Sequence, residues 1–182
     1  VEAIKAMHEG RAKVFLGLGG NFVSAPADTE FTAAGLRKCN LTAHVSTKLN
    51  RAHVVTGRTA LILPCLGRTE IDLQAGGEQF QTCEDSMGII NPTRGNLRPS
   101  SSGLLSEVAI VAGIAKAVLG AAKPVEWDAY VANYDLIRDK IAAVVPGFTN
   151  YNQRIRQGIF YLPNGPRDER KFATPSGKAV FI

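Results

Sequence analysis

Three polar loops, each placed after an apolar stretch, contain the residue types that bind anions. They are the sets Gly17, Gly19, Gly20 and Asn21; Ser46, Thr47, Lys48, Asn50 and Arg51; and Arg68, Thr69 and Glu70. Glycine lets backbone N–H groups approach phosphate oxygens closely, and hydroxyl, amide and cationic side chains donate hydrogen bonds to them. We therefore treat the three loops as candidates for binding a nucleotide or a diphosphate.

Basic residues are concentrated around these loops. The net charge is +5, and no Asp or Glu occurs between Glu30 and Glu70, where the sequence has Arg37, Lys38, Lys48, Arg51, Arg58 and Arg68. Such a one-sided distribution suits an anionic ligand, although a solvated basic face would have the same composition. A nucleic-acid surface would need aromatic side chains among the cations. Phe31 is the one aromatic residue in this region, so we expect no nucleic-acid partner.

The glycine pattern does not match two common nucleotide-binding motifs. Counted from Gly17, the fingerprint G-x-G-x-x-G has Phe22 at its third glycine position, and no acidic residue ends the stretch 40–47 to hold a ribose. The P-loop signature, in which Lys and then Ser or Thr follow the last glycine, is also missing. A plain NAD-binding unit is therefore disfavoured.

No set of residues has the spacing of a catalytic or metal centre. Of the histidines, we retain His44 and His53 as candidates because they lie near the basic loop, although single histidines are more often structural. Three widely spaced cysteines predict reduced thiols, a cytoplasmic location and no metal or iron–sulfur site in this chain. Glu84 and Asp85 would point to opposite faces of a strand, so we expect them to be solvated or to anchor a loop.

The order of the predicted elements indicates an α/β fold. After a helix near 2–12, apolar and β-branched runs predict strands at 14–18, 40–47 and 59–64, and Asp28 is placed to cap a helix ending at Leu36. The run 59–64 is apolar and ends in proline, as expected of a buried parallel strand. We expect a three-layer, Rossmann-like parallel sheet flanked by helices, with the polar loops at its carboxyl edge.

The second half of the chain is less regular. Residues 79–90 predict one strand, and 91–103 are rich in Pro, Gly, Ser and Asn and predict a loop. Ser106 is placed to cap a helix that ends at Gly120, and an apolar stripe over 127–144 predicts one further helix packed in a core. The basic stretch after Gly147 is expected to be a loop. No apolar run approaches the roughly 20 residues of a membrane-spanning helix.

Four stretches together resemble the molybdopterin oxidoreductase superfamily, most closely its formate dehydrogenase alpha-subunit-like branch. They are FLGLGGNFVSAPAD, HVSTKLNRAHVVTGRTALILPCLGRTEID, GGEQFQTCEDSMGIINPTRGNLRPSS and SEVAIVAGIAKAVLG. In that superfamily a G-x-N turn follows a strand, a Ser/Thr-containing loop ends the next strand, and an LP…E segment follows, here Pro64 and Glu70. A later helix opens on an acidic residue, matching Glu107. Phe22 departs from the proline of many members, and the loop 46–53 is more basic than usual.

The resemblance implies that residues 1–147 form a domain that binds one arm of a bis-molybdopterin guanine dinucleotide (bis-MGD) cofactor. Residues 148–182 would be a linker and the start of a C-terminal β-barrel cap domain. The glycine turn would line a guanosine diphosphate, the set from Ser46 to Arg51 would bind phosphate or nucleoside, and the set from Arg68 to Glu70 would approach from the third strand. The chain would be an internal fragment, which its first and last residues also suggest, and would carry no catalytic residue.

The parent enzyme, in this interpretation, oxidises formate or a similar small substrate at molybdenum. Its molybdenum ligand, and an iron–sulfur cluster if it has one, would lie in other parts of the same polypeptide. Two other classes stay open from the residues alone. One is a binding domain for another diphosphate cofactor, such as the middle domain of thiamine-diphosphate enzymes, and the other is the disfavoured nucleic-acid module.

Overall fold

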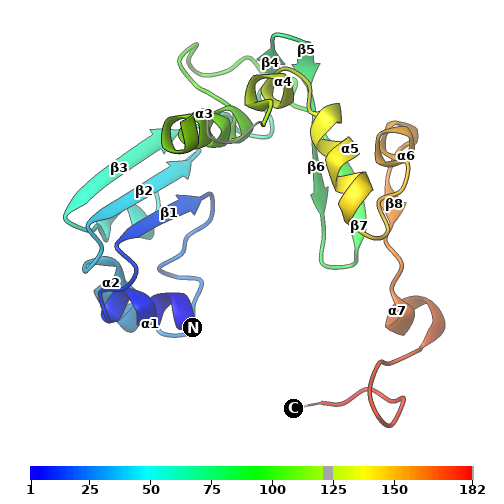
Figure 1. The fold of residues 1–182 in the computed structure, drawn as a ribbon, viewed down its shortest axis with the longest axis horizontal. Helices are drawn as coiled ribbons and strands as arrows, with labels where there is room; N and C mark the ends of the chain where they lie inside the picture. The colour runs from blue at the N-terminus through cyan, green and yellow to red at the C-terminus, as the bar shows by residue number, and fades with distance from the viewer. Residues whose placement is uncertain (121–124, 182) are drawn as a thin grey trace. The chain divides into compact units, whose positions relative to one another are not determined.

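The computed structural model describes residues 1–120 and 125–181 (Figure 1). The chain forms two compact units. The first, here called the sheet unit, contains Val1–Gly67 and Arg98–Val118, and the second, the hairpin unit, contains Arg68–Leu97 and Leu119–Ile182. The candidate loops are thus divided between the units, with Arg68, Thr69 and Glu70 in the hairpin unit.

The sheet unit is an α/β structure around three parallel strands. Its elements are α1 (Glu2–His8), β1 (Val14–Leu18), α2 (Thr29–Leu36), β2 (Leu41–Ser46), the 3-10 helix η1 (Arg51–Val54), β3 (Thr59–Pro64) and α3 (Glu107–Leu119). The strands lie in the order β1-β2-β3, with Leu16, Ala43 and Leu61 side by side in register. The predicted fold class and all three predicted strands are confirmed.

Helices cover both faces of this sheet, because the pleat sends alternate side chains to opposite sides. On one face, Phe15 of β1 packs in a cluster with Met7 of α1 and Leu36 of α2. On the other face, Val45 of β2 packs against Ile110 of α3. The sheet is therefore the middle of three layers, as predicted.

Side-chain caps start two of the helices at the predicted residues. The carboxylate of Asp28 accepts a hydrogen bond from the Phe31 N–H at 2.8 Å at the start of α2. The Ser106 hydroxyl accepts one from the Ala109 N–H at 3.2 Å at the start of α3. Each cap satisfies an N–H that has no partner within its helix. The first helix is shorter than predicted and ends at His8, before Gly10 turns the chain with a φ of +72°.

The prediction that the strand 59–64 is buried is wrong for this chain. Leu61 is 46% exposed and Ile62, on the opposite face, is 45% exposed. Among the strands of residues 1–120 and 125–181, β3 pairs with β2 only, so it is an edge strand, and just after it Cys65 forms a single bridge with Leu105. The four-residue η1 replaces the longer helix that normally covers a parallel strand, and α3 reaches the strand only near Leu63. The apolar sequence of β3 is typical of an interior strand, whereas its position in this sheet is that of an edge strand.

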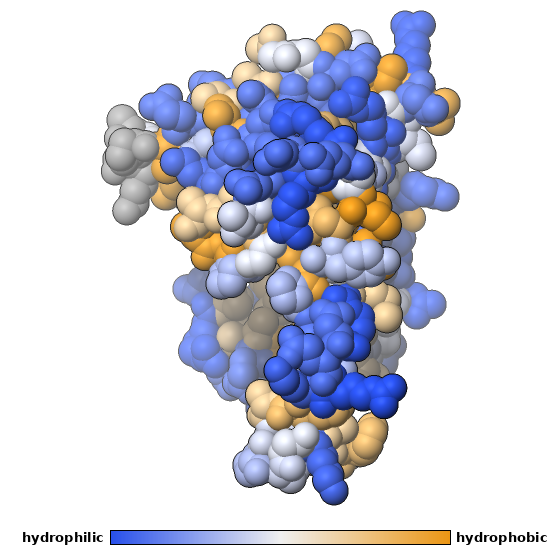
Figure 2. Space-filling model, turned by 90° about the vertical axis from the view of Figure 1, so that its right-hand side faces the viewer, coloured by the Kyte–Doolittle hydropathy of each residue, from blue (hydrophilic) through white to orange (hydrophobic). Residues whose placement is uncertain are grey.

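The hairpin unit is built from short antiparallel strands and short helices. Its elements are β4 (Asp72–Gln74), β5 (Gly77–Gln79), β6 (Gln81–Glu84), β7 (Ile89–Thr93), α4 (Trp127–Ala132), α5 (Asp135–Val144), α6 (Tyr151–Gln157), β8 (Phe160–Tyr161) and α7 (Gly165–Glu169). β4 pairs with β5, and the other strands form a sheet in the order β6-β7-β8. A core cluster forms where Ile90 meets Tyr151 and Phe160. The face drawn in Figure 2 is mainly hydrophilic, with smaller hydrophobic areas between.

Several predictions for this second half are wrong. Residues 79–90 contain the last residue of β5, all of β6 and the start of β7 instead of one strand. Asp85 turns the chain between β6 and β7 by accepting hydrogen bonds from the N–H groups of Met87 and Ile89, at 2.8 and 3.1 Å. That role confirms Asp85 as a loop anchor. The predicted loop at 91–103 begins inside β7, which tolerates Pro92 because β8 pairs only with residues 89 and 90. The expected loop after Gly147 contains α6, β8 and α7.

The stripe 127–144 forms two helices rather than one. The break falls at Asn133, whose side-chain oxygen accepts from the Asp135 N–H at 3.0 Å. Tyr134 is held there by the hairpin β4-β5: its N–H donates to Gln79 at 2.9 Å, and its hydroxyl donates to Asp72 at 2.6 Å. Tyr134 is buried as the core interpretation requires, whereas Val144 at the end of the stripe is exposed.

The domain boundary after Gly147 refers to a longer protein and stays a prediction. Within this chain, Phe148 packs in the same cluster as Ile90 of β7. Among residues 1–120 and 125–181, no helix has both the length and the apolar character needed to cross a membrane.

Candidate functional site

The glycine turn after β1 presents open backbone at the carboxyl edge of the sheet. Gly19 and Gly20 have φ values of +66° and +69°, a left-handed conformation that favours glycine. The Gly19 N–H donates to the Val45 carbonyl at 2.8 Å, which ties the turn to β2. A Cβ added to Gly20 would meet nothing within 4 Å. The turn is thus fixed at one end and open where a ligand could approach.

Gly17 lies inside β1 and serves packing. A Cβ at this position would lie 2.9 Å from the Phe15 ring and 3.2 Å from Nδ1 of His44. The close approach of these two rings explains the glycine without a ligand. Its predicted role in cofactor binding is not tested by this geometry.

The second polar loop is fastened to the glycine turn by Asn50. The Asn50 Nδ2 donates to the Gly20 carbonyl at 2.8 Å, while its Oδ1 accepts from the Ala52 N–H at 2.9 Å. The Ser46 hydroxyl donates to the Lys48 carbonyl at 2.7 Å and bends the loop back on itself. The predicted meeting of these loops is therefore confirmed, with Asn50 holding them in place.

Exposed cations lie on the fastened loop. Thr47, Lys48 and Arg51 are all exposed. Within the described residues, neither Lys48 nor Arg51 forms an ion pair. Two uncompensated positive charges beside an open glycine turn suit a phosphate group, because charge-assisted hydrogen bonds are the strong ones.

Glu107 is the residue near the turn that the predicted binding set omitted. It lies in the first turn of α3, and its Oε1 is 3.7 Å from the position that a Cβ on Gly19 would take. An ionised carboxylate accepts hydrogen bonds only. Beside the open glycine turn it suits the N–H groups of a base or the hydroxyls of a sugar. The acidic start of the helix was the one sequence signal for this residue.

The two retained histidines are buried beneath the loops. The rings of His44 and His53 lie 4.8 Å apart, and both side chains are more than nine-tenths buried. The Asn50 N–H donates to Nδ1 of His53 at 2.9 Å. Nε2 of each histidine and Oδ1 of Asn21 are buried without a partner among the described residues. The pair therefore supports the Asn50 loop from below and does not face the surface as an acid or base would.

Burial, and next the charge of His53, lower the pKa of His44. As the pH falls through about 6.5, His44 therefore binds a proton more readily in the unfolded chain than in the folded chain. We expect the free energy of unfolding to be fully retained above about pH 6.5 and to fall as the pH drops below it. Urea titrations between about pH 7.5 and 5.5 should show this loss, and His44→Gln should reduce it.

His8→Gln is the matched control, since it removes a histidine outside the pair. The His8→Gln variant should keep the part of the loss that His44 causes. Equal pH dependence in the His44→Gln variant and in the unchanged chain would contradict the assignment of this loss to His44.

The third polar loop lies in the hairpin unit. The Thr69 carbonyl accepts hydrogen bonds from the N–H groups of Asn96 and Leu97 at 3.0 and 2.9 Å, and Glu70 forms a parallel bridge with Leu97. These contacts fix the loop within its own unit. The participation of Arg68, Thr69 and Glu70 in the nucleotide site stays a prediction. No group of three or more His, Cys, Asp or Glu suited to a metal occurs in the described ranges.

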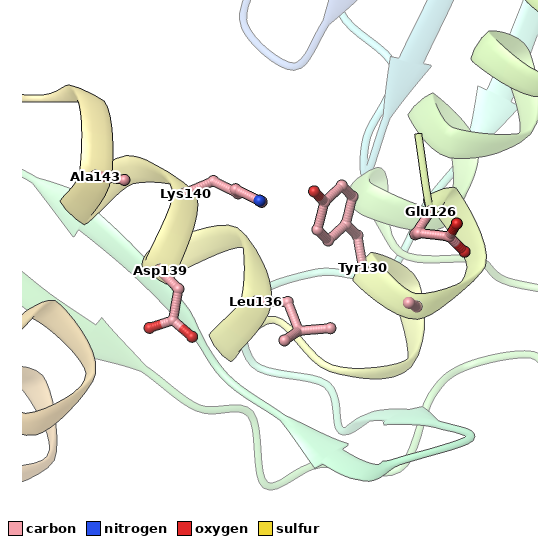
Figure 3. Close-up of a pocket in the computed structure, with 7 residues that line it drawn as sticks. Glu126, Tyr130, Leu136, Asp139, Lys140 and Ala143 are labelled. Atoms are coloured by element: carbon pink, nitrogen blue, oxygen red, sulfur yellow. The ribbon is translucent and has the colours of Figure 1, made fainter. Parts of the chain in front are cut away.

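A separate hollow of about 420 Å³ lies between α4 and α5 of the hairpin unit (Figure 3). Leu136 and two alanines contribute apolar walls, and the Lys140 ammonium and the Tyr130 hydroxyl point toward one another. None of the predicted binding residues lines it. The candidate site therefore remains the carboxyl edge of the sheet unit.

Comparison with known proteins relates the chain to two larger bacterial proteins. Over its full 182 residues it is 52% identical to a protein of Mycobacterium tuberculosis named uncharacterized oxidoreductase. It is 48% identical, over 183 aligned positions, to the protein YdeP of Escherichia coli. No protein-family model matches the chain. It spans 23% and 24% of the lengths of these two relatives. The region that matches this chain is thus about a quarter of each of these larger proteins, one of which is named an oxidoreductase.

Proposed function

We propose that this chain is the part of a larger molybdopterin-type oxidoreductase that binds one guanine nucleotide arm of bis-MGD. The observation that carries the proposal is the joining of the open glycine turn to the basic loop through the hydrogen bond from Asn50 to Gly20. The oxidoreductase name of the mycobacterial relative supports the enzyme class. The resemblance of the sequence motifs supports the cofactor.

The donors and acceptors present fit a guanosine diphosphate. Open backbone at Gly20 and the cations Lys48 and Arg51 suit the diphosphate. The carboxylate of Glu107 suits N–H groups, which guanine presents on the edge where adenine has an acceptor and a C–H group. The buried Oδ1 of Asn21, which has no partner among the described residues, is an acceptor suited to a further donor.

Each residue then has a defined task in holding the nucleotide arm. Gly19 and Gly20 let the diphosphate approach the backbone. Lys48 and Arg51 neutralise it, and the Thr47 hydroxyl helps to orient it. Asn21 and Glu107 select the base or sugar, while Ser46 and Asn50 shape the loop. When bound, the cofactor would supply two-electron redox chemistry at molybdenum for formate or a similar small substrate, with no catalytic residue from this chain.

Calorimetry with GDP tests the proposal directly. We expect GDP to bind more tightly than ADP or thiamine diphosphate, because guanine presents adjacent ring N–H and amino donors on one edge to the carboxylate of Glu107. Lys48→Ala should weaken GDP binding about tenfold, the equivalent of ~1.4 kcal/mol, through loss of a charge-assisted contact. Asn21→Ala should weaken binding by a smaller factor, since it removes a neutral acceptor.

Arg37→Ala is the matched control for charge. Arg37 is exposed and follows α2, at the end of the sheet where β2 begins, so its loss changes the net charge without changing the loop. Equal losses of affinity in Lys48→Ala and Arg37→Ala would indicate unspecific attraction of an anion. Tighter binding of thiamine diphosphate than of GDP would favour the thiamine-diphosphate class instead.

A further inference from the structure

The strand β3 has an uncovered apolar surface on both of its faces. Leu61 on one face and Ile62 on the other are each nearly half exposed. On the face of Leu61, the neighbouring side chains Leu16 and Leu18 of β1 are 48% and 49% exposed. Parallel strands are normally buried on both faces, and runs of apolar residues mark them. The apolar composition of β3 is therefore that of a buried strand, although both of its faces are exposed to solvent in this chain.

Among the described residues, the outer edge of β3 is paired only just beyond its end, where Cys65 forms a parallel bridge with Leu105 and the Leu66 N–H donates to the Leu105 carbonyl at 2.9 Å. The Thr59 N–H donates to the carbonyl of Asn40, just before β2, and the Cys65 N–H donates to that of Ser46 at the end of β2. Because donors in a parallel ladder alternate along the strand, the N–H groups of Ala60 and Ile62 point to the free edge. Natural edge strands carry charges, bulges or interior prolines that prevent pairing. β3 has no charged residue, and its proline is the last residue.

We propose that β3 is an interior strand of a larger sheet, completed by a strand and a covering helix from another part of the same longer polypeptide. This inference rests on the part of the proposed function that places the chain in a longer protein. The relatives are more than four times as long as the region they share with this chain, which spans 23% of the mycobacterial protein. The occupant is an apolar strand, since the edge offers backbone groups and the faces offer Leu and Ile side chains.

Residue-resolved amide hydrogen exchange distinguishes the two positions of the strand. In the chain alone, the amides of Leu61 and Leu63 should exchange slowly, while those of Ala60 and Ile62 exchange fast. In the longer gene product, the amides of Ala60 and Ile62 should slow by at least about tenfold. Fast exchange of Ala60 and Ile62 in both proteins would overturn the proposal.

Slow exchange of those two amides already in the chain alone would overturn it too, because the edge would then be covered from within the chain or by a second copy. Sedimentation of the chain over a range of concentrations separates those two cases. GDP affinity is measured independently of hydrogen exchange. Fast exchange in both proteins would therefore not affect the proposed nucleotide site, and absence of GDP binding would not affect the assignment of β3.

A charge substitution adds a second readout. Ile62→Lys should lower the thermal midpoint of the longer protein but leave that of the chain alone unchanged. Val54→Lys is the control, because Val54 lies in η1 and is 80% exposed, and it should leave both midpoints unchanged. Equal tolerance of the two substitutions in the longer protein would contradict an interior β3.

Discussion

Replacement of Arg138 by alanine is expected to lower the free energy of unfolding of the hairpin unit by about 3–5 kcal/mol. Arg138 is 4% exposed, and its guanidinium donates to Asn152 at 2.7 Å, to the Phe80 carbonyl at 3.1 Å and to Asp135. It also lies 4.1 Å from the centroid of the Phe80 ring. The substitution removes all of these contacts at once. Urea denaturation followed by circular dichroism measures the loss.

Arg156→Ala is the matched control, because Arg156 pairs with the same carboxylate, Asp135, but is half exposed. Its loss should cost less than about 1 kcal/mol, as solvent screens an exposed pair. Burial opposes ionisation of Asp135, but hydrogen bonds from both arginines hold its pKa below the usual range. Equal losses from the two substitutions would show that the buried packing of Arg138 contributes nothing beyond its charge.

The second large effect is expected from Gly57→Ala in the sheet unit. A Cβ on Gly57 would overlap the backbone carbonyl oxygen of Cys39 and lie 3.3 Å from the Cys39 Cβ. The Gly57 N–H also donates to the hydroxyl of the buried Thr42 at 3.2 Å, so the chain cannot shift freely. We expect a loss of about 3 kcal/mol or more in the free energy of unfolding, since overpacking against backbone forces the elements apart.

Gly113→Ala provides a control of opposite sign. Gly113 lies within α3, and a Cβ there would meet nothing within 4 Å. Alanine should therefore stabilise the helix by roughly 0.5–1 kcal/mol. In thermal denaturation, the midpoint of Gly57→Ala should fall and that of Gly113→Ala should rise. A stable Gly57→Ala variant would show that the segment leading into β3 can move away from Cys39.

The sheet unit was predictable because its signals are local. Each parallel strand is a short run rich in apolar or β-branched residues, and Asp28 caps its helix within three residues. The meeting of the Gly20 and Asn50 loops follows from the parallel order of the strands, which places both at one edge. Glu107 was missed because α3 brings it to Gly19 from a distant part of the sequence. No local pattern reports such an approach.

The hairpin unit was predicted poorly because distant contacts decide its structure. The apolar stripe alone predicts one helix, yet the side chains of Gln79 and Asp72 hold Tyr134 at the break. After Gly147, the buried residues Tyr151 and Ile155 are separated by three polar residues, which concealed a helical spacing. Their burial depends on Ile90 in a strand from the other half of the sequence.

The position of α4 provides a reporter that distinguishes the two units. Trp127 is the single tryptophan of the sequence and lies in α4, so its fluorescence follows the hairpin unit alone. Circular dichroism, in contrast, records the helices of both units. Coincident midpoints from the two signals would mean that the units unfold as one cooperative block, and separated midpoints would assign each unit its own transition.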